Sequence, residues 1–116
     1  MRTITVFPDQ LPYYMKRKDY EIWDVREQQD YIKCHVRGAK NVPFSLYEAS
    51  DFSIETAMKK EMNYIFYCER GHMSLEFARI ACNKGYHVKS VIGGIRQIKQ
   101  LGIDSILSSI LIYGTR

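Results

Sequence analysis

The residues best suited to chemistry surround Cys68, which ends an apolar run typical of a strand and precedes a pattern typical of a helix. A short loop at such a junction directs several backbone N–H groups toward one point, and the positive end of the helix dipole adds to their effect. Because these groups stabilise an anion, we expect a thiol held there to be a good sulfur nucleophile. After accepting a sulfur atom, it would form a stable persulfide.

The loop around this thiol would be formed by the six residues that follow it, Glu69, Arg70, Gly71, His72, Met73 and Ser74. Gly71 lets the loop bend where a Cβ atom would crowd it. Arg70 and His72 would add positive character at its rim. A second interpretation stays open, in which Cys68 only fills a gap in the core at a strand end, as free cysteines often do.

Two other groups of residues could also carry chemistry. Asp24 and Arg26 end an earlier strand-like run, and we expect them to brace the loop network rather than to react. His35 follows Cys34, a pair that could bind a metal or respond to redox state, although a structural histidine at a helix end is the favoured interpretation. Cys34 could act as a resolving thiol only if the fold brought it near Cys68.

The cysteine count disfavours both a disulfide framework and a zinc site. The chain of 116 residues has three cysteines, at positions 34, 68 and 82, without C-x-x-C spacing. Free thiols fit a reducing compartment, and Cys82 is expected to be a core residue. Neither a signal-peptide block nor a run long enough to span a bilayer is visible, so we expect a cytoplasmic location and no membrane partner.

The formal charge of +4 suits anionic small ligands or acidic partner surfaces, but it is weak evidence for nucleic acid. The run PYYMKRKDY, residues 12–20, combines basic and aromatic side chains as an RNA groove would. A solvated helix end has the same composition. We therefore do not expect nucleic acid to be a partner.

Strands and helices that could position these residues alternate along the chain. Strand-like runs occupy residues 4–7, 20–25, 39–42, 64–67 and 88–92. Helical patterns occupy residues 11–17, 27–35, 45–62 with a break at 50–51, 75–83 with Ser74 as the N-cap, and 95–101. This alternation predicts an α/β fold with a mainly parallel five-stranded sheet, helices on both of its faces, and one domain over residues 1–116.

The last apolar residues follow the spacing of an amphipathic helix. They are Ile103, Ile106, Leu107, Ile110 and Leu111. Such a helix would complete the core, or alternatively would form a dimerisation face.

In an open parallel sheet, ligands bind at the carboxyl ends of the strands, which is where residue 68 is expected to lie.

Three motifs, in order and at the right separations, resemble those of the single-domain rhodanese family of sulfurtransferases over nearly the whole chain. They are WDVREQQDYIKCHVRGAKNVP at residues 23–43, FYCERGHMS at residues 66–74, and KGYHVKSVIGGI at residues 84–95. The resemblance implies a rhodanese-like fold. It also implies that Cys68 accepts sulfane sulfur as a persulfide, with the amides of residues 69–73 around it, and passes it to a thiol or other small acceptor. The acceptor thiol that the resemblance implies can belong to a small molecule or to a protein.

Two positions depart from the family pattern. Met73 stands where the family's active loops often carry an arginine, and Ile98 stands where an aromatic residue is common. A thiosulfate dianion would lose a charge-assisted partner at residue 73. The sequence therefore favours a polysulfide, a persulfide or a protein as the sulfur donor.

The alternative function is a non-catalytic rhodanese-like module that binds a partner or senses redox state. A phosphatase or arsenate reductase of the related fold is disfavoured, because its loop would need an arginine where Ser74 stands. No cofactor is implied, since a thiolate held by amides needs neither a metal nor a nucleotide.

Overall fold

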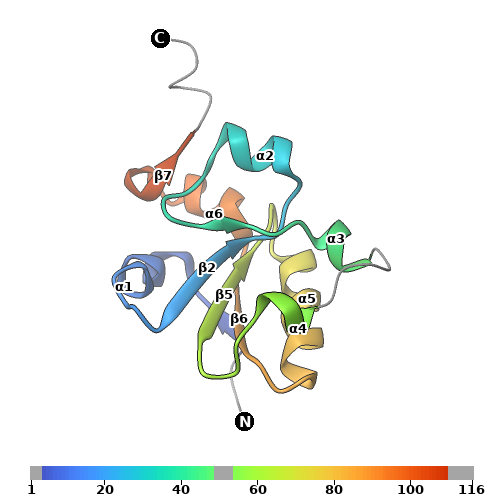
Figure 1. Ribbon diagram of the computed structural model, residues 1–116. Coiled ribbons are helices and arrows are strands. Elements are labelled where there is room, and N and C mark those ends of the chain that lie inside the picture. Colours follow the sequence, from blue (N-terminus) through green and yellow to red (C-terminus); the bar gives the residue numbers. More distant parts are fainter. Residues whose placement is uncertain (1–3, 49–53, 110–116) are drawn as a thin grey trace.

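The computed structural model of the protein describes residues 4–48 and 54–109. Five parallel strands form its central sheet, in the order β1-β6-β5-β2-β4 (Figure 1). They are β1 (Thr5–Val6), β2 (Tyr20–Asp24), β4 (Lys40–Asn41), β5 (Asn63–Tyr67) and β6 (His87–Val91). The predicted parallel sheet is thus confirmed, with β5 at its centre and β1 at one edge.

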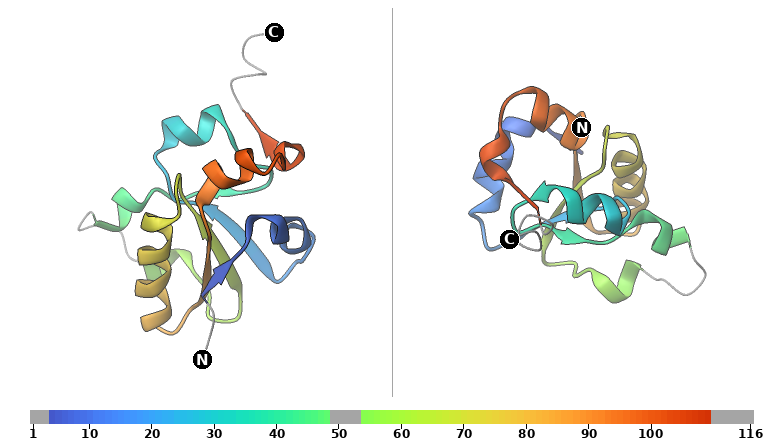
Figure 2. Two further views of the ribbon diagram at one scale, coloured as in Figure 1. Left: turned by 180° about the vertical axis from the view of Figure 1, so that it is seen from behind. Right: turned by 90° about the horizontal axis from the view of Figure 1, so that it is seen from above.

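Helices cover both faces of this sheet (Figures 1 and 2). One face packs against α1 (Leu11–Met15), which follows the 3-10 turn η1 (Pro8–Gln10), and against α6 (Gly94–Gln100). The opposite face packs against α5 (His72–Asn83), with the short helices α3 (Phe44–Glu48) and α4 (Ile54–Ala57) on the same side. A further helix, α2 (Gln28–Lys33), follows β2. None of the described helices is long and apolar enough to cross a membrane.

The core consists of two apolar clusters separated by the sheet. Along β5 the side chains alternate, so Tyr64 and Phe66 join the cluster under α5, while Ile65 and Tyr67 join the cluster under α1 and α6. Burial on both faces explains why this strand is a continuous apolar run without alternation. The next residue, Cys68, lies at the carboxyl end of the sheet's central strand.

The predicted C-terminal helix is wrong for the part of it that the structure describes. Residues 104–106 form a 3-10 turn, η2 (Asp104–Ile106), and the next two form the strand β7 (Leu107–Ser108). This strand pairs antiparallel with β3 (His35–Val36), a strand that the sequence had placed at the end of a helix. Pairing with β3 therefore overrides the helical spacing. The last two apolar positions, 110 and 111, lie outside the described residues.

The predicted helix at residues 45–62 is also shorter than expected. It is replaced by α3 and α4, and residues 58–62 form a turn in which Met58 is buried. The predicted break at residues 50–51 lies outside the described residues. These short helices leave α5 as the main cover of that face of the sheet.

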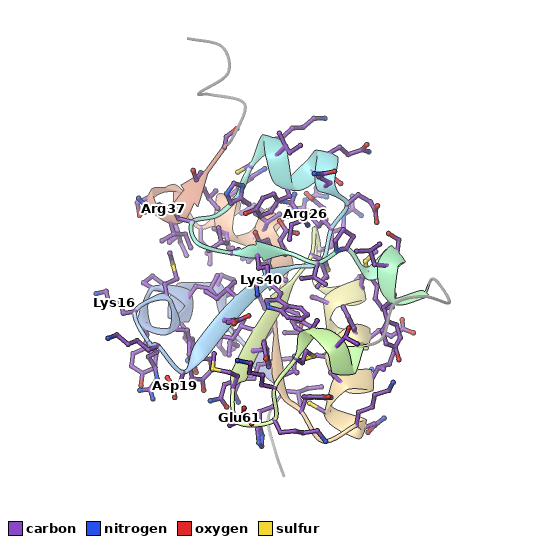
Figure 3. The ribbon with its side chains drawn as sticks, in the orientation of Figure 1. Lys16, Asp19, Arg26, Arg37, Lys40 and Glu61 are labelled. Carbon is purple, nitrogen blue, oxygen red and sulfur yellow. The ribbon has the colours of Figure 1, made fainter. Side chains whose placement is uncertain are left out.

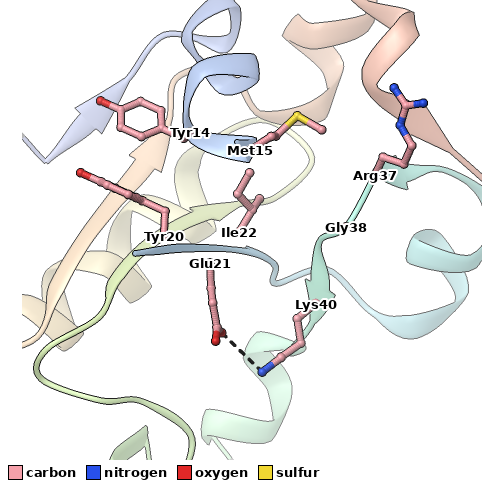
Figure 4. Close-up of a pocket in the computed structure, with 8 residues that line it drawn as sticks. All are labelled: Tyr14, Met15, Tyr20, Glu21, Ile22, Arg37, Gly38 and Lys40. Carbon is pink, nitrogen blue, oxygen red and sulfur yellow. Dashed lines mark ion pairs between the residues drawn. The ribbon is translucent and has the colours of Figure 1, made fainter. Parts of the chain in front are cut away.

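The edge strand β4 is short, and its two residues pair with Trp23 and Asp24 of β2. Beside it, α1, β2 and the segment 37–40 enclose a pocket of about 280 Å3 (Figure 4). An ion pair of 3.4 Å between Glu21 and Lys40 joins the two strands at this pocket. This exposed pair adds only a little to the backbone pairing that joins β4 to β2.

Candidate active site around Cys68

The fold places Cys68 in the lining of a surface pocket of about 600 Å3. Its side chain is 3% exposed. The pocket is lined by residues from two loops and the starts of α2 and α5, namely Arg26, Glu27, Asp30, Cys68, Glu69, Arg70, His72 and Met73. Of the six loop residues predicted to surround the thiol, Glu69, Arg70, His72 and Met73 line this pocket, and Gly71 and Ser74 do not.

Three polar groups contact the sulfur atom of Cys68. The backbone N–H of Gly71 donates to Sγ at 3.1 Å, and the backbone N–H of Ser74 donates at 3.3 Å. The thiol in turn donates to the Ser74 hydroxyl at 3.3 Å. Two main-chain donors aimed at one sulfur atom, with a hydroxyl beside them, would stabilise a thiolate at this position.

The backbone of Gly71 creates this arrangement. Its φ is +97°, a left-handed backbone conformation that residues other than glycine rarely adopt. The helix α5 begins at the next residue. A Cβ atom at Gly71 would lie 2.9 Å from the backbone nitrogen of Gly93. The prediction of Ser74 as the N-cap is wrong, because Gly71 occupies that position. Ser74 is instead in the first turn of α5, fully buried, with its N–H directed at the thiol.

A second glycine turn, at Gly93 and Gly94, brings the start of α6 against the backbone of the loop that follows Cys68. The first amides of α6 bind the loop carbonyls, from Ile95 N–H to Cys68 O at 2.9 Å and from Arg96 N–H to Glu69 O at 3.1 Å. This approach is close enough that a Cβ atom at Gly94 would lie 2.4 Å from Cys68 O. The Gly-Gly step before α6 therefore holds the thiol loop in position.

Ser90 belongs to the site but was missed by the sequence reasoning. It is 1% exposed on β6, and its hydroxyl lies 2.7 Å from the Ser74 hydroxyl. The chain of contacts runs from Ser90 through Ser74 to the sulfur of Cys68. The available signal was a serine two positions after Val88, on the same face of the strand-like run VKSVI, where a buried hydroxyl needs a partner.

We expect Ser90→Ala to lower the rate at which iodoacetamide alkylates Cys68 at pH 7 by about threefold to tenfold. The reason is that the hydroxyl of Ser74 would lose the partner that orients it toward Sγ, a loss of roughly 1 kcal/mol for one hydrogen bond. Ser109→Ala is the control, since its hydroxyl binds Ile32 O elsewhere in the fold. Equal alkylation rates in Ser90→Ala and the wild type would contradict the role.

Behind the loop lies a buried polar network centred on Asp24. Its carboxylate is fully buried and accepts hydrogen bonds from the Arg26 backbone at 2.9 Å, from Arg26 Nη2 at 2.8 Å and from Tyr67 Oη at 2.9 Å. The Tyr67 hydroxyl also accepts the N–H of Val36 at 2.9 Å. Asp24 and Arg26 therefore share one buried hydrogen-bond network, and Tyr67 joins them from the central strand.

Arg26 connects this network to the loop of Cys68. Its Nη1 lies 3.2 Å from Glu69 Oε1, the residue next to the thiol, and its Nη2 donates to the carbonyl of Cys34. Burial alone would lower the pKa of Arg26, but the hydrogen bonds to Asp24 outweigh it and raise the pKa above its ordinary value. The guanidinium therefore stays charged while it is 7% exposed.

The network makes alkaline stability depend on Tyr67. Burial, then the Asp24 carboxylate, raises the pKa of Tyr67 well above its ordinary value of about 10. Below about pH 10 the phenol is neutral in both the folded and the unfolded chain. Above that pH only the unfolded chain ionises, so stability falls by up to about 1.4 kcal/mol per pH unit from this one group.

We expect Tyr67→Phe to be about 1–3 kcal/mol less stable than the wild type at pH 8, because Val36 N–H and Asp24 each lose a partner. The difference should shrink between pH 10 and pH 11, since the variant lacks this ionisation. Urea unfolding at several pH values measures both effects. A difference that is constant up to pH 11 would argue against the raised pKa.

The other residues that could carry chemistry, His35, Cys34 and Cys82, are packed against neighbouring parts of the fold. His35 is buried, its Nδ1 lies 2.7 Å from Tyr31 O, and its ring stacks on that of Tyr31. Cys34 packs with the cluster under α1 and α6, on the other side of the sheet from the cluster that contains Cys68. Cys82 packs at the edge of the cluster under α5 and donates to Val88 O. Among the described residues, no group of three His, Cys, Asp or Glu side chains could hold a metal ion.

Comparison with models of protein families finds a match that covers most of the chain. The model of a family described as the rhodanese-like domain matches residues 7–101. No curated protein sequence matches the chain at a significant level.

Solved structures agree with the fold. A rhodanese-related protein from Thermoplasma volcanium superposes with a TM-score of 0.72 at 22% identity, covering 88% of this chain and 94% of its own. An uncharacterised protein from Saccharomyces cerevisiae has a TM-score of 0.75 at 19% identity, covering 90% of this chain and 98% of its own. A thiosulfate sulfurtransferase from Pseudomonas aeruginosa has a TM-score of 0.66 at 20% identity, covering 87% of this chain and 19% of its own.

Proposed function

Because this chain belongs to the family of rhodanese-like domains, we propose that it is a sulfurtransferase in which Cys68 carries sulfur as a persulfide. The observation that carries the proposal is the pair of backbone N–H groups, from Gly71 and Ser74, that point at the Cys68 sulfur. The opening of the pocket beside this sulfur gives a donor and then an acceptor access to it.

The proposed reaction has two balanced steps. In the first, the Cys68 thiolate attacks the sulfane sulfur of a persulfide donor, forming a new S–S bond while the donor leaves as a thiolate. In the second, an acceptor thiolate attacks the outer sulfur of Cys68–S–SH, and the Cys68 thiolate leaves with the electron pair of the broken bond. The proton on the outer sulfur moves with it, so no external oxidant, reductant or cofactor is consumed.

A polysulfide, a persulfide or a protein persulfide is the proposed donor. Thiosulfate is a dianion, and Met73 is 43% exposed in the pocket at the position where the family often provides an arginine. Arg70 lies on the same rim but at a different point of the loop. The pocket therefore lacks a dedicated partner for the sulfonate oxygens of thiosulfate, and polysulfides and persulfides have no such oxygens.

The test is the intact mass of the protein after treatment with polysulfide and removal of excess reagent. A variant with Cys34→Ser and Cys82→Ser, which keeps Cys68 as its remaining cysteine, should still gain one sulfur atom. The added sulfur should leave on incubation with a thiol. A wild-type protein that gains no sulfur under these conditions would refute the proposed function.

The second candidate is a non-catalytic rhodanese-like module that binds a partner or senses redox state. It is favoured by the low exposure of Cys68, 3%, and by Met73 in place of the arginine. It predicts that iodoacetamide reacts slowly with residue 68 at pH 7. A sulfurtransferase should react well below pH 8, so the alkylation rate at neutral pH distinguishes the two candidates.

A further inference from the structure

The pocket above Cys68 is acidic, although the protein as a whole is basic. Three carboxylates line it, those of Glu27, Asp30 and Glu69. The cationic residues in its lining are Arg26 and Arg70, and His72 is also present. The sign of the local charge therefore depends on which of these groups are already neutralised by a partner.

Arg26 contributes no net positive charge to the pocket. Its guanidinium makes a 2.8 Å ion pair with Asp24, which is fully buried beneath it. It makes a second ion pair, of 3.2 Å, with Glu69. One cation thus faces two carboxylates, and this cluster alone is negative by one charge.

Glu27 and Asp30 remain available to act on a ligand. Glu27 is exposed at the start of α2, and Asp30 is half-buried in the first turn of that helix. Within residues 4–48 and 54–109, neither carboxylate has an ion pair or a side-chain hydrogen bond. Apart from Arg26, the guanidinium in the pocket lining that can oppose their charge is that of Arg70.

The resulting field is opposite in sign to that of the whole chain. Counting Asp24, four carboxylates stand against two guanidinium groups, an excess of two negative charges when His72 is neutral. The complete sequence carries +4. A cleft lined by charge of one sign concentrates ligands of the opposite sign and repels those of the same sign. This pocket should therefore repel anionic thiols and attract cationic ones.

We propose that the acceptor of sulfur from Cys68 is a thiol with a positive charge close to its sulfur atom. This inference rests on the proposed sulfurtransferase function and specifies its second step. An ammonium or guanidinium group of the acceptor would lie against Glu27 and Asp30, while its thiolate attacks the outer sulfur of Cys68–S–SH. Both an amine-bearing small thiol and a cysteine within a basic peptide have this chemistry. Met73 supplies an apolar contact for the carbon atoms next to the acceptor sulfur.

The experiment starts from protein loaded with one sulfur atom by polysulfide and verified by intact mass. Transfer rates are then measured with cysteamine, 2-mercaptoethanol and 3-mercaptopropionate, which carry an amine, a hydroxyl and a carboxylate respectively. Two further arms use a short cysteine peptide flanked by lysines and the same peptide flanked by glutamates. Each rate is divided by that of a Glu27→Gln, Asp30→Asn double variant, so differences in thiol nucleophilicity cancel.

At low salt, we expect the wild type to favour the cationic over the anionic thiol by at least about tenfold relative to the double variant. Salt at 0.5 M should remove most of this preference, because it screens the carboxylates. The control is Glu61→Gln, which changes an exposed acid at the opposite end of the sheet from Arg26 (Figure 3) and should keep the wild-type preference. If the lysine peptide reacts faster than cysteamine, the acceptor is a basic polypeptide; the reverse order indicates a small amine thiol.

Two results would overturn the inference in distinguishable ways. A loaded wild type with the same charge preference as the double variant would refute the cationic acceptor and leave the sulfurtransferase function intact. A protein that takes up no sulfur at the loading step would refute both. The mass measured before any acceptor is added separates these two outcomes.

Discussion

Cys68→Ser is expected to remove sulfur uptake completely and to lower sulfur transfer by at least about a thousandfold, since a serine hydroxyl cannot form a persulfide. Its oxygen would still fit between the N–H groups of Gly71 and Ser74, which now contact the sulfur. The fold should therefore survive, with a melting temperature close to that of the wild type. Intact mass after polysulfide treatment and the transfer rate to a thiol measure the two losses.

The loss should be complete because neither other cysteine has comparable surroundings. Cys34 packs in the cluster under α1 and α6, and Cys82 donates its S–H to the carbonyl of Val88. No backbone N–H is aimed at either sulfur in the described part of the chain. If the Cys68→Ser protein still gained a sulfur atom that a thiol could remove, residue 68 would not be the carrier.

The position of the reactive loop could be predicted because it depends on local sequence. A buried apolar strand, a cysteine, a glycine and a helix follow one another within a few residues, and parallel strands bring such a junction to the ligand-binding edge of a sheet. The helix begins three residues earlier than the sequence predicts. Serine is a common N-cap, but here the left-handed turn at Gly71 starts the helix earlier and turns Ser74 inward.

The residues that were missed depend on contacts between distant segments. Ser90 reaches Ser74 only because β6 pairs with β5 in a register that places Ser90 beside Phe66. Tyr67 looks like any apolar core residue in the sequence, yet its hydroxyl joins β5 to Asp24 and to Val36. Register and long-range pairing are not encoded in a short window of sequence, so the polar partners of the site required the fold.

The C-terminal segment also depends on long-range pairing that a short window of sequence does not encode. Its apolar spacing matches a helix. An apolar stripe, however, indicates only that one side of the segment is buried, and not whether the segment is a helix or a strand. The short strand β3 offers a free edge, and Leu107 and Ser108 satisfy it by antiparallel pairing. The N–H of Arg37 also donates to the carbonyl of Ile106 at 2.7 Å. These tertiary hydrogen bonds outweigh the local preference for a helix.

Asp24→Asn is expected to lower the free energy of unfolding by about 3–5 kcal/mol, since it leaves the buried guanidinium of Arg26 without its principal counter-charge. Asparagine has nearly the same shape as aspartate, so the loss would come from charge and hydrogen bonding rather than from a cavity. Urea unfolding at pH 7 measures the change. Asp19→Asn, which breaks the exposed ion pair with Arg17, is the matched control and should have a much smaller effect.

A second substitution separates the cost of an unpaired charge from other effects of changing Asp24. If the cost comes from Arg26, then replacing that arginine by methionine in the Asp24→Asn protein should recover part of the lost stability, because no uncompensated charge remains. The double variant should nevertheless transfer sulfur more slowly than the wild type, since Arg26 no longer holds Glu69 beside the thiol. A double variant less stable than Asp24→Asn alone would mean that packing of the arginine side chain, and not its charge, dominates the network.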